Sequence, residues 1–324
     1  MDKIINLGIP HVGELIFENI DTPGLIKCLE VSQTWKVVAE NVLLKRWKGK
    51  MLEACKSGET KIVQVLLERC NSEESGLNAK DEDGCTAFLL ACFYGNTYVV
   101  KLLLDQSNID LNARNNHQLT AFILACSERG NEDVIKLLLD HSERINLNAT
   151  DNYGLTAFIL ACLKGHKNVV QLLLDHYERI EVNAADNSGL TGFMYACKYG
   201  HKNVAQLLLQ HSEKIELNAR NNGRTAFTIA CFRGQKDVVK LLLEHSKDVD
   251  ITIPENYSRI ESLSREIRYL IDIHQSRALE RRAPERRSDW SERGRSATCD
   301  CFPERYSERR SRKRPERNSY YSLL

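Results

Sequence analysis

The stretch from Leu147 to Phe158, Leu-Asn-Ala-Thr-Asp-Asn-Tyr-Gly-Leu-Thr-Ala-Phe, recurs along the chain and decides the fold. Four close copies begin at Leu77, Leu111, Val182 and Leu217. The threonines of the five copies lie 34, 36, 35 and 34 residues apart. A unit that returns with this period indicates stacked copies of one supersecondary structure.

Each copy predicts a turn followed by two helices. The segment rich in Asn, Asp and Gly suits a turn, and the threonine is positioned to cap the first helix. A glycine follows where a left-handed residue would end that helix. These glycines are Gly95, Gly130, Gly165, Gly200 and Gly234. An apolar stripe such as Val99 to Leu104 then predicts the second helix. Because one such helix pair cannot bury its own apolar face, neighbouring pairs must stack.

This repeat resembles the ankyrin repeat. Where that family has Thr-Pro-Leu-His, these copies have Thr-Ala-Phe and an aliphatic residue, or Thr-Gly-Phe-Met at Thr191. Loss of the proline costs about 0.4 to 1 kcal/mol per repeat, and we expect burial of the larger phenylalanine to offset it. The resemblance implies an all-α ankyrin-repeat solenoid of helix-turn-helix repeats with hairpin loops over residues 50–275. It comprises a partial repeat at 50–76, full repeats from 77, 111, 147, 182 and 217, and a degenerate capping repeat at 251–275.

The cysteines and histidines recur with the same period. Six cysteines each follow an alanine: Cys55, Cys92, Cys126, Cys162, Cys197 and Cys231. We predict that they form a buried row, since positions one repeat apart cannot converge on one metal ion. Four histidines end the second helices, where an imidazole suits the helix dipole: His141, His176, His211 and His245. The sequence therefore predicts no catalytic residue, no metal site and no cofactor, and a protein that is not an enzyme.

Residues 4–48 lie outside the repeat and predict three short helices. The segment resembles an F-box in Ile9-Pro10, in Ile16-Phe17 and above all in the run Val31-Ser32-Gln33-Thr34-Trp35-Lys36. The opening departs from the family pattern, because it has a glycine, Gly13, where an acidic residue usually follows the proline, and the spacing to Ile16-Phe17 is slightly short. The resemblance implies binding to a Skp-type adaptor of a cullin ubiquitin ligase, and the positions carried over are Pro10, Leu15, Ile16, Leu25, Cys28, Val31 and Trp35. The alternative is a helical cap that seals the first repeat.

The ankyrin resemblance also implies a partner-binding face, formed by the hairpin tips and the concave side of the first helices. The positions that map there are Leu90, Phe93, Tyr94, Leu124, Arg129, Leu163, Lys164, Tyr195, Lys198, Tyr199, Phe232 and Arg233. Aromatic anchors beside Lys and Arg are typical of interaction hot spots. The basic residues lie towards the later repeats, which predicts an acidic or phosphorylated partner segment. The alternative is that the aromatic residues pack between repeats and the charges only solvate the surface.

The chain has 45 Lys or Arg and 44 Asp or Glu, but these charges are unevenly distributed. Residues 276–324 hold 14 Lys or Arg against 8 Asp or Glu, and their few aliphatic residues predict a disordered Arg-rich tail. Its basic run from Arg309 to Pro315 is compatible with a nuclear signal or a phosphate-binding patch. The scattered glutamates argue against a nucleic-acid partner. No apolar run reaches the length of a membrane span, and no signal-like segment opens the chain. We expect a cytoplasmic or nuclear protein.

These features predict a substrate-recruiting adaptor of a Skp-cullin-F-box ubiquitin ligase. The first module would bind the ligase core, and the ankyrin repeats would bind a target protein. We expect the chain to act as a monomer within a hetero-complex. The alternative is a non-ligase ankyrin scaffold or inhibitor that acts purely by binding other proteins.

Overall fold

The computed structural model describes residues 17–47, 50–69, 77–127, 131–252 and 265–282. Contacts divide the chain into two compact units, Met1–Ile267 and Arg268–Leu324. The described residues form helices and loops but no strands, apart from isolated bridges between Ala185 and Thr191 and between Asn221 and Arg224. None of these helices is long and apolar enough to span a membrane. The predicted all-helical fold is confirmed.

Two helices precede the repeats in the described part of the chain. These are α3 (Thr22–Cys28) and α4 (Gln33–Trp47). The carboxylate of Asp21 accepts a hydrogen bond of 2.9 Å from the Gly24 amide, which caps α3. The hydroxyl of Ser32 accepts one of 3.3 Å from the Trp35 amide, so Ser32 caps α4. Helix α4 packs against both α3 and the first repeat.

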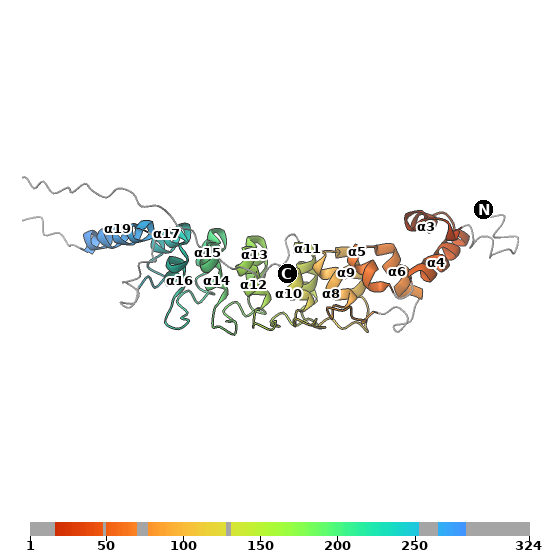
Figure 1. The fold of residues 1–324 in the computed structure, drawn as a ribbon, viewed down its shortest axis with the longest axis horizontal. Helices are drawn as coiled ribbons and strands as arrows, with labels where there is room; N and C mark the ends of the chain where they lie inside the picture. Colours follow the sequence, from red (N-terminus) through yellow and green to blue (C-terminus); the bar gives the residue numbers. More distant parts are fainter. Residues whose placement is uncertain (1–16, 48–49, 70–76, 128–130, 253–264, 283–324) are drawn as a thin grey trace, which may run out of the picture. The chain divides into compact units, whose positions relative to one another are not determined.

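Six helix pairs follow, and each contains a first and a second helix. They are α5 (Met51–Ser57) with α6 (Thr60–Arg69), α8 (Ala87–Phe93) with α9 (Thr97–Leu104), α10 (Ala121–Ser127) with α11 (Glu132–Asp140), α12 (Ala157–Lys164) with α13 (Lys167–Leu174), α14 (Gly192–Tyr199) with α15 (Lys202–Gln210), and α16 (Ala226–Arg233) with α17 (Lys236–Glu244). First helices pack against first helices of neighbouring pairs, and second helices pack against second helices. Figure 1 shows the two rows, with the hairpin loops below them.

Threonine and glycine set the limits of the first helices, as the sequence predicts. The hydroxyl of Thr156 accepts a hydrogen bond from the Ile159 amide, and the equivalent threonines cap α8, α14 and α16 in the same way. Gly165 then ends α12 with φ of +77°, and Gly200 and Gly234 end α14 and α16 in the same left-handed conformation. A side chain other than glycine would be strained there. Gly130 lies outside the described residues.

The core between the rows is built from repeated positions. The phenylalanine after each capping Thr-Ala or Thr-Gly pair is at most 2% exposed: Phe88, Phe122, Phe158, Phe193 and Phe227. The cysteine row is buried throughout, which confirms the prediction from the repeat period. Burial raises the pKa of the Cys55 and Cys231 thiols to about 12, and it raises the pKa of the other four above its usual range as well.

This burial predicts a pattern of thiol reactivity. Because alkylation requires the thiolate and access to it, the six cysteines of the row are expected to resist iodoacetamide at pH 8 in the native chain. Cys85, which is partly exposed, is expected to react first among the cysteines of the full repeats. Mass spectrometry of the alkylated chain measures both, with the urea-unfolded chain as the control. Native labelling of Cys126 or Cys162 as fast as Cys85 would contradict the buried row.

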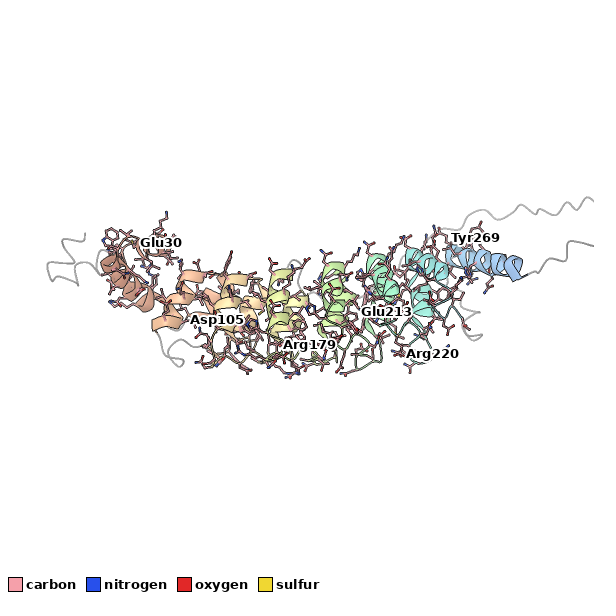
Figure 2. The ribbon with its side chains drawn as sticks, turned by 180° about the vertical axis from the view of Figure 1, so that it is seen from behind. Glu30, Asp105, Arg179, Glu213, Arg220 and Tyr269 are labelled. Atoms are coloured by element: carbon pink, nitrogen blue, oxygen red, sulfur yellow. The ribbon has the colours of Figure 1, made fainter. Side chains whose placement is uncertain are left out.

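Asparagine side chains join successive hairpins. The Asn148 amide donates to the Arg179 carbonyl at 3.1 Å and accepts from the Glu181 amide at 2.9 Å. The same two bonds are made by Asn78, Asn112, Asn183 and Asn218, each to the next hairpin. Figure 2 shows Arg179 and Arg220 in this loop layer, where they pair with Glu143 and Asp250 at 2.6 and 2.5 Å. Each repeat thus satisfies backbone groups of its neighbour.

A second set of bonds joins the helices on the opposite side of each repeat. Five residues that each follow a repeated glycine bond to the first helix of the preceding repeat: Asn96, Asn131, His166, His201 and Gln235. Asn131 donates to the Cys92 and Phe93 carbonyls at 3.1 Å, and Gln235 donates to the Lys198 carbonyl at 3.1 Å. The imidazole Nε2 of His201 lies 2.7 Å from the Leu163 carbonyl. These bonds satisfy carbonyls that the end of a helix leaves without partners.

The C-terminal part of the chain contains one further described helix, α19 (Arg265–Arg282). The sequence predicted a degenerate capping repeat up to residue 275 and a disordered tail beyond it. Residues 276–282 are helical instead, so the start of the tail was predicted too early. The run Arg277-Ala278-Leu279-Glu280 consists of good helix formers, and the Ser276 hydroxyl donates to the Asp272 carbonyl at 2.9 Å. The remainder of the predicted tail lies outside the described residues.

Candidate protein-interaction surfaces

The structure divides the predicted partner-binding residues by exposure. Leu124, Leu163 and Tyr195 are only 4%, 7% and 4% exposed. They are buried because neighbouring first helices pack against one another. Their side chains therefore belong to the packed interior of the row and do not present a surface. Leu90, Phe93, Lys164, Lys198 and Phe232 are half-buried, and Tyr94, Tyr199 and Arg233 are exposed. Arg129 lies outside the described residues.

Tyr195 is held in place by an acidic residue of its own hairpin. Its hydroxyl donates to Oδ2 of Asp186 at 2.6 Å. The other carboxylate oxygen accepts from the Leu190 and Ser188 amides at 2.7 and 3.0 Å. Burial by itself would raise the pKa of Asp186, but the hydrogen bonds from Tyr195, Leu190 and Ser188 outweigh it and lower the pKa. Asp186 therefore remains ionised and has its oxygens occupied.

The side chain of Lys198 lies over the two tyrosines of helix α14. Its ammonium is 5.0 Å from the centre of the Tyr195 ring and 5.5 Å from that of Tyr199. The two rings are parallel within 4°, with centres 6.2 Å apart. We call Tyr195, Lys198 and Tyr199 the tyrosine–lysine cluster. The face of each ring attracts the ammonium, which partly replaces the water that half-burial removes.

Two further cations lie on or just before the next first helix, α16. Arg233 is exposed in the last turn of α16, and it acts electrostatically on Lys198. The pKa of Lys198 is lowered by burial first and by the positive charge of Arg233 second. The guanidinium of Arg224 lies 5.5 Å from the centre of the Phe232 ring. The later repeats thus combine positive charge with aromatic surface, as the sequence predicted for this region.

A smaller aromatic group lies at the other end of the row. Phe93 and Tyr94 meet edge to face with their ring centres 5.0 Å apart. The ammonium of Lys56, from the preceding repeat, lies 5.6 Å from the Tyr94 ring centre. Tyr94 is nevertheless 46% exposed, so its ring remains accessible.

The N-terminal module separates its predicted adaptor-binding residues into core and surface. Leu25 and Cys28 are buried, and Trp35 packs edge to face on Phe17 with ring centres 5.6 Å apart. Val31 is 58% exposed. Sequence reasoning missed Val37, which is 49% exposed on α4. Its apolar character within a helix that is otherwise polar on that side was the available signal. Pro10, Leu15 and Ile16 lie outside the described residues.

The histidines that end the second helices act as helix caps. Nδ1 of His141, His176 and His245 lies 2.9 to 3.0 Å from the carbonyl four residues earlier. A carbonyl can only accept, so Nδ1 carries the proton in each case. Within the described residues, no group of three or more His, Cys, Asp or Glu side chains could hold a metal ion.

The stacked helix pairs and their exposed aromatic and basic residues define a repeat protein of the protein-binding class. The chain matches the family described as ankyrin repeats (3 copies) over residues 50–115, 112–186 and 178–253. It belongs to the ankyrin-repeat family. Among solved structures, it is similar to an ankyrin repeat domain from Acinetobacter baumannii AYE, with a TM-score of 0.52 and 26% identity. That similarity covers 61% of this chain and 97% of the bacterial one.

Proposed function

We propose that this chain is a non-enzymatic, substrate-recruiting adaptor of a Skp-cullin-F-box ubiquitin ligase. The N-terminal module would bind a Skp-type adaptor, and the ankyrin repeats would hold the target protein. The observation that carries the proposal is the exposed pair of valines, Val31 and Val37, within and beside the F-box-like run from Val31 to Lys36. Two exposed apolar side chains on one small module support an interaction surface there.

The geometry of α4 supports a partner on one side of this module. One side of α4 is buried and contains Val38, Ala39, Val42 and Leu43. A second set of α4 residues, each four positions after the last, is exposed. The exposed set is Gln33, Val37, Asn41 and Lys45. Because α4 also packs against α6, a partner bound to the exposed side would be held at a fixed position relative to the first repeat. A recruiting adaptor needs this fixed separation between its two partners.

The repeats supply the second binding surface. Tyr94, Tyr199 and Arg233 are exposed on first helices, beside half-buried Phe93 and Lys198. This composition supports a protein target with an acidic or phosphorylated segment. The chain would act as a monomer within the ligase complex, in the cytoplasm or the nucleus. The free thiols of the described cysteines support such a reducing compartment.

The test is co-purification of the full chain with a Skp-type adaptor. Val31→Asp and Val37→Asp are each expected to weaken adaptor binding at least tenfold, because they place a charge in an apolar contact. Tyr98→Asp is the matched control, since Tyr98 is 77% exposed on α9, away from the module. These variants test the surface more directly than changes at buried Leu25 or partly buried Trp35, which would also disturb the fold.

Two outcomes would count against the ligase role. One is a stable wild-type chain that binds no Skp-type adaptor, and the other is adaptor binding that neither valine substitution weakens. The alternative function, an ankyrin scaffold or inhibitor, is equally compatible with the packing of α4 on α6, since a helical cap would make the same contact. On that alternative, the two valine variants leave all partner binding intact.

A further inference from the structure

Two cations lie at the ends of neighbouring first helices. Lys198 is in the last turn of α14 and Arg233 is in the last turn of α16, and these helices pack against one another. The side chain of Gln235, two residues after Arg233, donates to the Lys198 carbonyl at 3.1 Å, which places the two helix ends next to each other. Neither the Lys198 nor the Arg233 side chain forms an ion pair or a side-chain hydrogen bond within the part of the chain that the structure describes. A lysine in the last turn of a helix complements the helix dipole. That role does not require half-burial or a second cation nearby.

The nearest acidic group does not neutralise this pair. Asp186 attracts Lys198 electrostatically, but its attraction is weaker than the combined opposition of burial and Arg233, so the pKa of Lys198 is lowered. Both carboxylate oxygens of Asp186 already accept hydrogen bonds from Tyr195, Ser188 and Leu190. Within the described residues, these two positive charges therefore have no ion-pair partner. A bound anion would supply one.

The aromatic rings make this location suitable for a peptide. Tyr195 and Tyr199 position the Lys198 ammonium, and the exposed Tyr199 ring offers apolar surface next to the charge. Phe232 is half-buried on α16 beside Arg233. Charged and aromatic groups together suit a protein segment that carries one concentrated anion and adjacent apolar side chains.

We propose that Lys198 and Arg233 form a binding site for the phosphate group of a phosphorylated segment of a partner protein. A phosphorylated side chain carries a charge of about −1.5 to −2, which matches two cations, whereas one Asp or Glu carboxylate carries a single charge. The guanidinium of Arg233 can donate two hydrogen bonds to phosphate oxygens, and Lys198 supplies a point charge. The site rests on the proposed function only in that the repeats bind a target protein.

The chain's own C-terminal segment is a poor match for this site. Residues 276–324 carry 14 Lys or Arg against 8 Asp or Glu, so their net charge would be repelled by Lys198 and Arg233. A phosphorylated partner is attracted by the same charges. Its affinity is expected to fall as salt concentration rises, because part of the site is exposed.

The experiment uses the full chain and a random peptide library with a fixed central phosphoserine, together with matched libraries that have serine or glutamate there. The tightest phosphopeptide selected is labelled, and its affinity is measured by fluorescence anisotropy. Lys198→Gln and Arg233→Gln are each expected to weaken binding about tenfold, as is typical for the loss of one charge-assisted contact. Lys240→Gln, an exposed change on α17, is the matched control and is expected to have no effect.

Four results would overturn the site. They are no enrichment of phosphopeptides, equal affinity for the glutamate peptide, an equal loss in the Lys240→Gln variant, and tighter binding of a single-stranded oligonucleotide at the same residues. Lys198→Arg, which keeps the charge, is expected to retain phosphopeptide binding. The Gln variants should unfold at the wild-type urea midpoint and should co-purify with a Skp-type adaptor as the wild type does. Failure of the phosphate site and failure of the ligase role are therefore distinguishable.

Discussion

Replacement of Phe158 by alanine is expected to lower the free energy of unfolding by about 3 to 5 kcal/mol. Phe158 is 1% exposed on α12, in the middle of the stack. A methyl group added to Gly192 would lie 3.0 Å from Cε1 of Phe158, so the ring packs directly on α14 of the next repeat. The truncation therefore removes buried area within its own repeat and contact across the junction. Urea unfolding followed by circular dichroism measures the loss.

The control for this change is Tyr153→Ala, which removes an aromatic ring from the hairpin of the same repeat. Tyr153 is 64% exposed, so its loss is expected to change stability by less than about 0.5 kcal/mol. Because each repeat contacts only its neighbours, Phe158→Ala is also expected to broaden the transition or divide it into two. A cost below about 1 kcal/mol would contradict the packing described for α12 and α14.

The second large effect is expected at Gly154, where alanine should cost about 2 to 3 kcal/mol. Gly154 has φ of +78° in the hairpin before α12, a conformation that disfavours a side chain. An added Cβ would also lie 2.7 Å from the backbone nitrogen of Asn187 in the next hairpin. Backbone atoms cannot move aside as the end of a flexible side chain can, so the junction between the two hairpins must shift.

Gly223→Ala separates the two causes of that cost. Gly223 has nearly the same φ, +76°, but an added Cβ there meets no atom within 4 Å. Gly223→Ala is expected to lower the free energy of unfolding by about 1 kcal/mol, because only the positive φ is unfavourable there. The difference between the two variants in urea unfolding measures the steric contribution. Equal costs would show that the contact with Asn187 is not a constraint on stability.

The repeat period was sufficient to predict the local structure of the ankyrin stack. A threonine that recurs just before each apolar run occupies the N-cap position of a helix. Its capping role could therefore be predicted from the sequence, as at Thr156. The cysteine row followed in the same way, because residues one repeat apart occupy equivalent positions, as Cys162 and Cys197 do, and so share burial. Periodicity establishes which positions are equivalent, and one reliable assignment then applies to all copies.

Periodicity does not establish what lies across a packed junction. Leu124, Leu163 and Tyr195 were assigned to the partner-binding face from helix position, but the neighbouring first helix covers them. Tyr195 additionally bonds to Asp186, a contact specific to that hairpin. Side chains of equivalent positions differ in length and polarity from copy to copy, so their exposure depends on the actual neighbours.

The hairpin asparagines were visible in the sequence, but their role was not inferred. The motif Leu-Asn-Ala contains an asparagine in each of four copies and Val-Asn-Ala contains it in the fifth. Sequence reasoning attributed the polar residues to turn formation. The structure shows that Asn148 and its equivalents instead bond to the next hairpin. A strictly repeated amide was the signal for a contact between copies, because a turn alone accepts several residue types.

The bonds between repeats have a consequence for how such a chain can change over evolutionary time. The asparagine of each Leu-Asn-Ala or Val-Asn-Ala motif bonds to the following hairpin, and the residue after the glycine that follows each later first helix bonds to the preceding repeat. Each copy therefore forms the same kinds of side-chain to backbone hydrogen bonds with the copies before and after it. Duplication or deletion of one unit of 34 to 36 residues would recreate the same bonds at the new junction. The length of the binding face can therefore be altered in one genetic event while the N-terminal module is left unchanged.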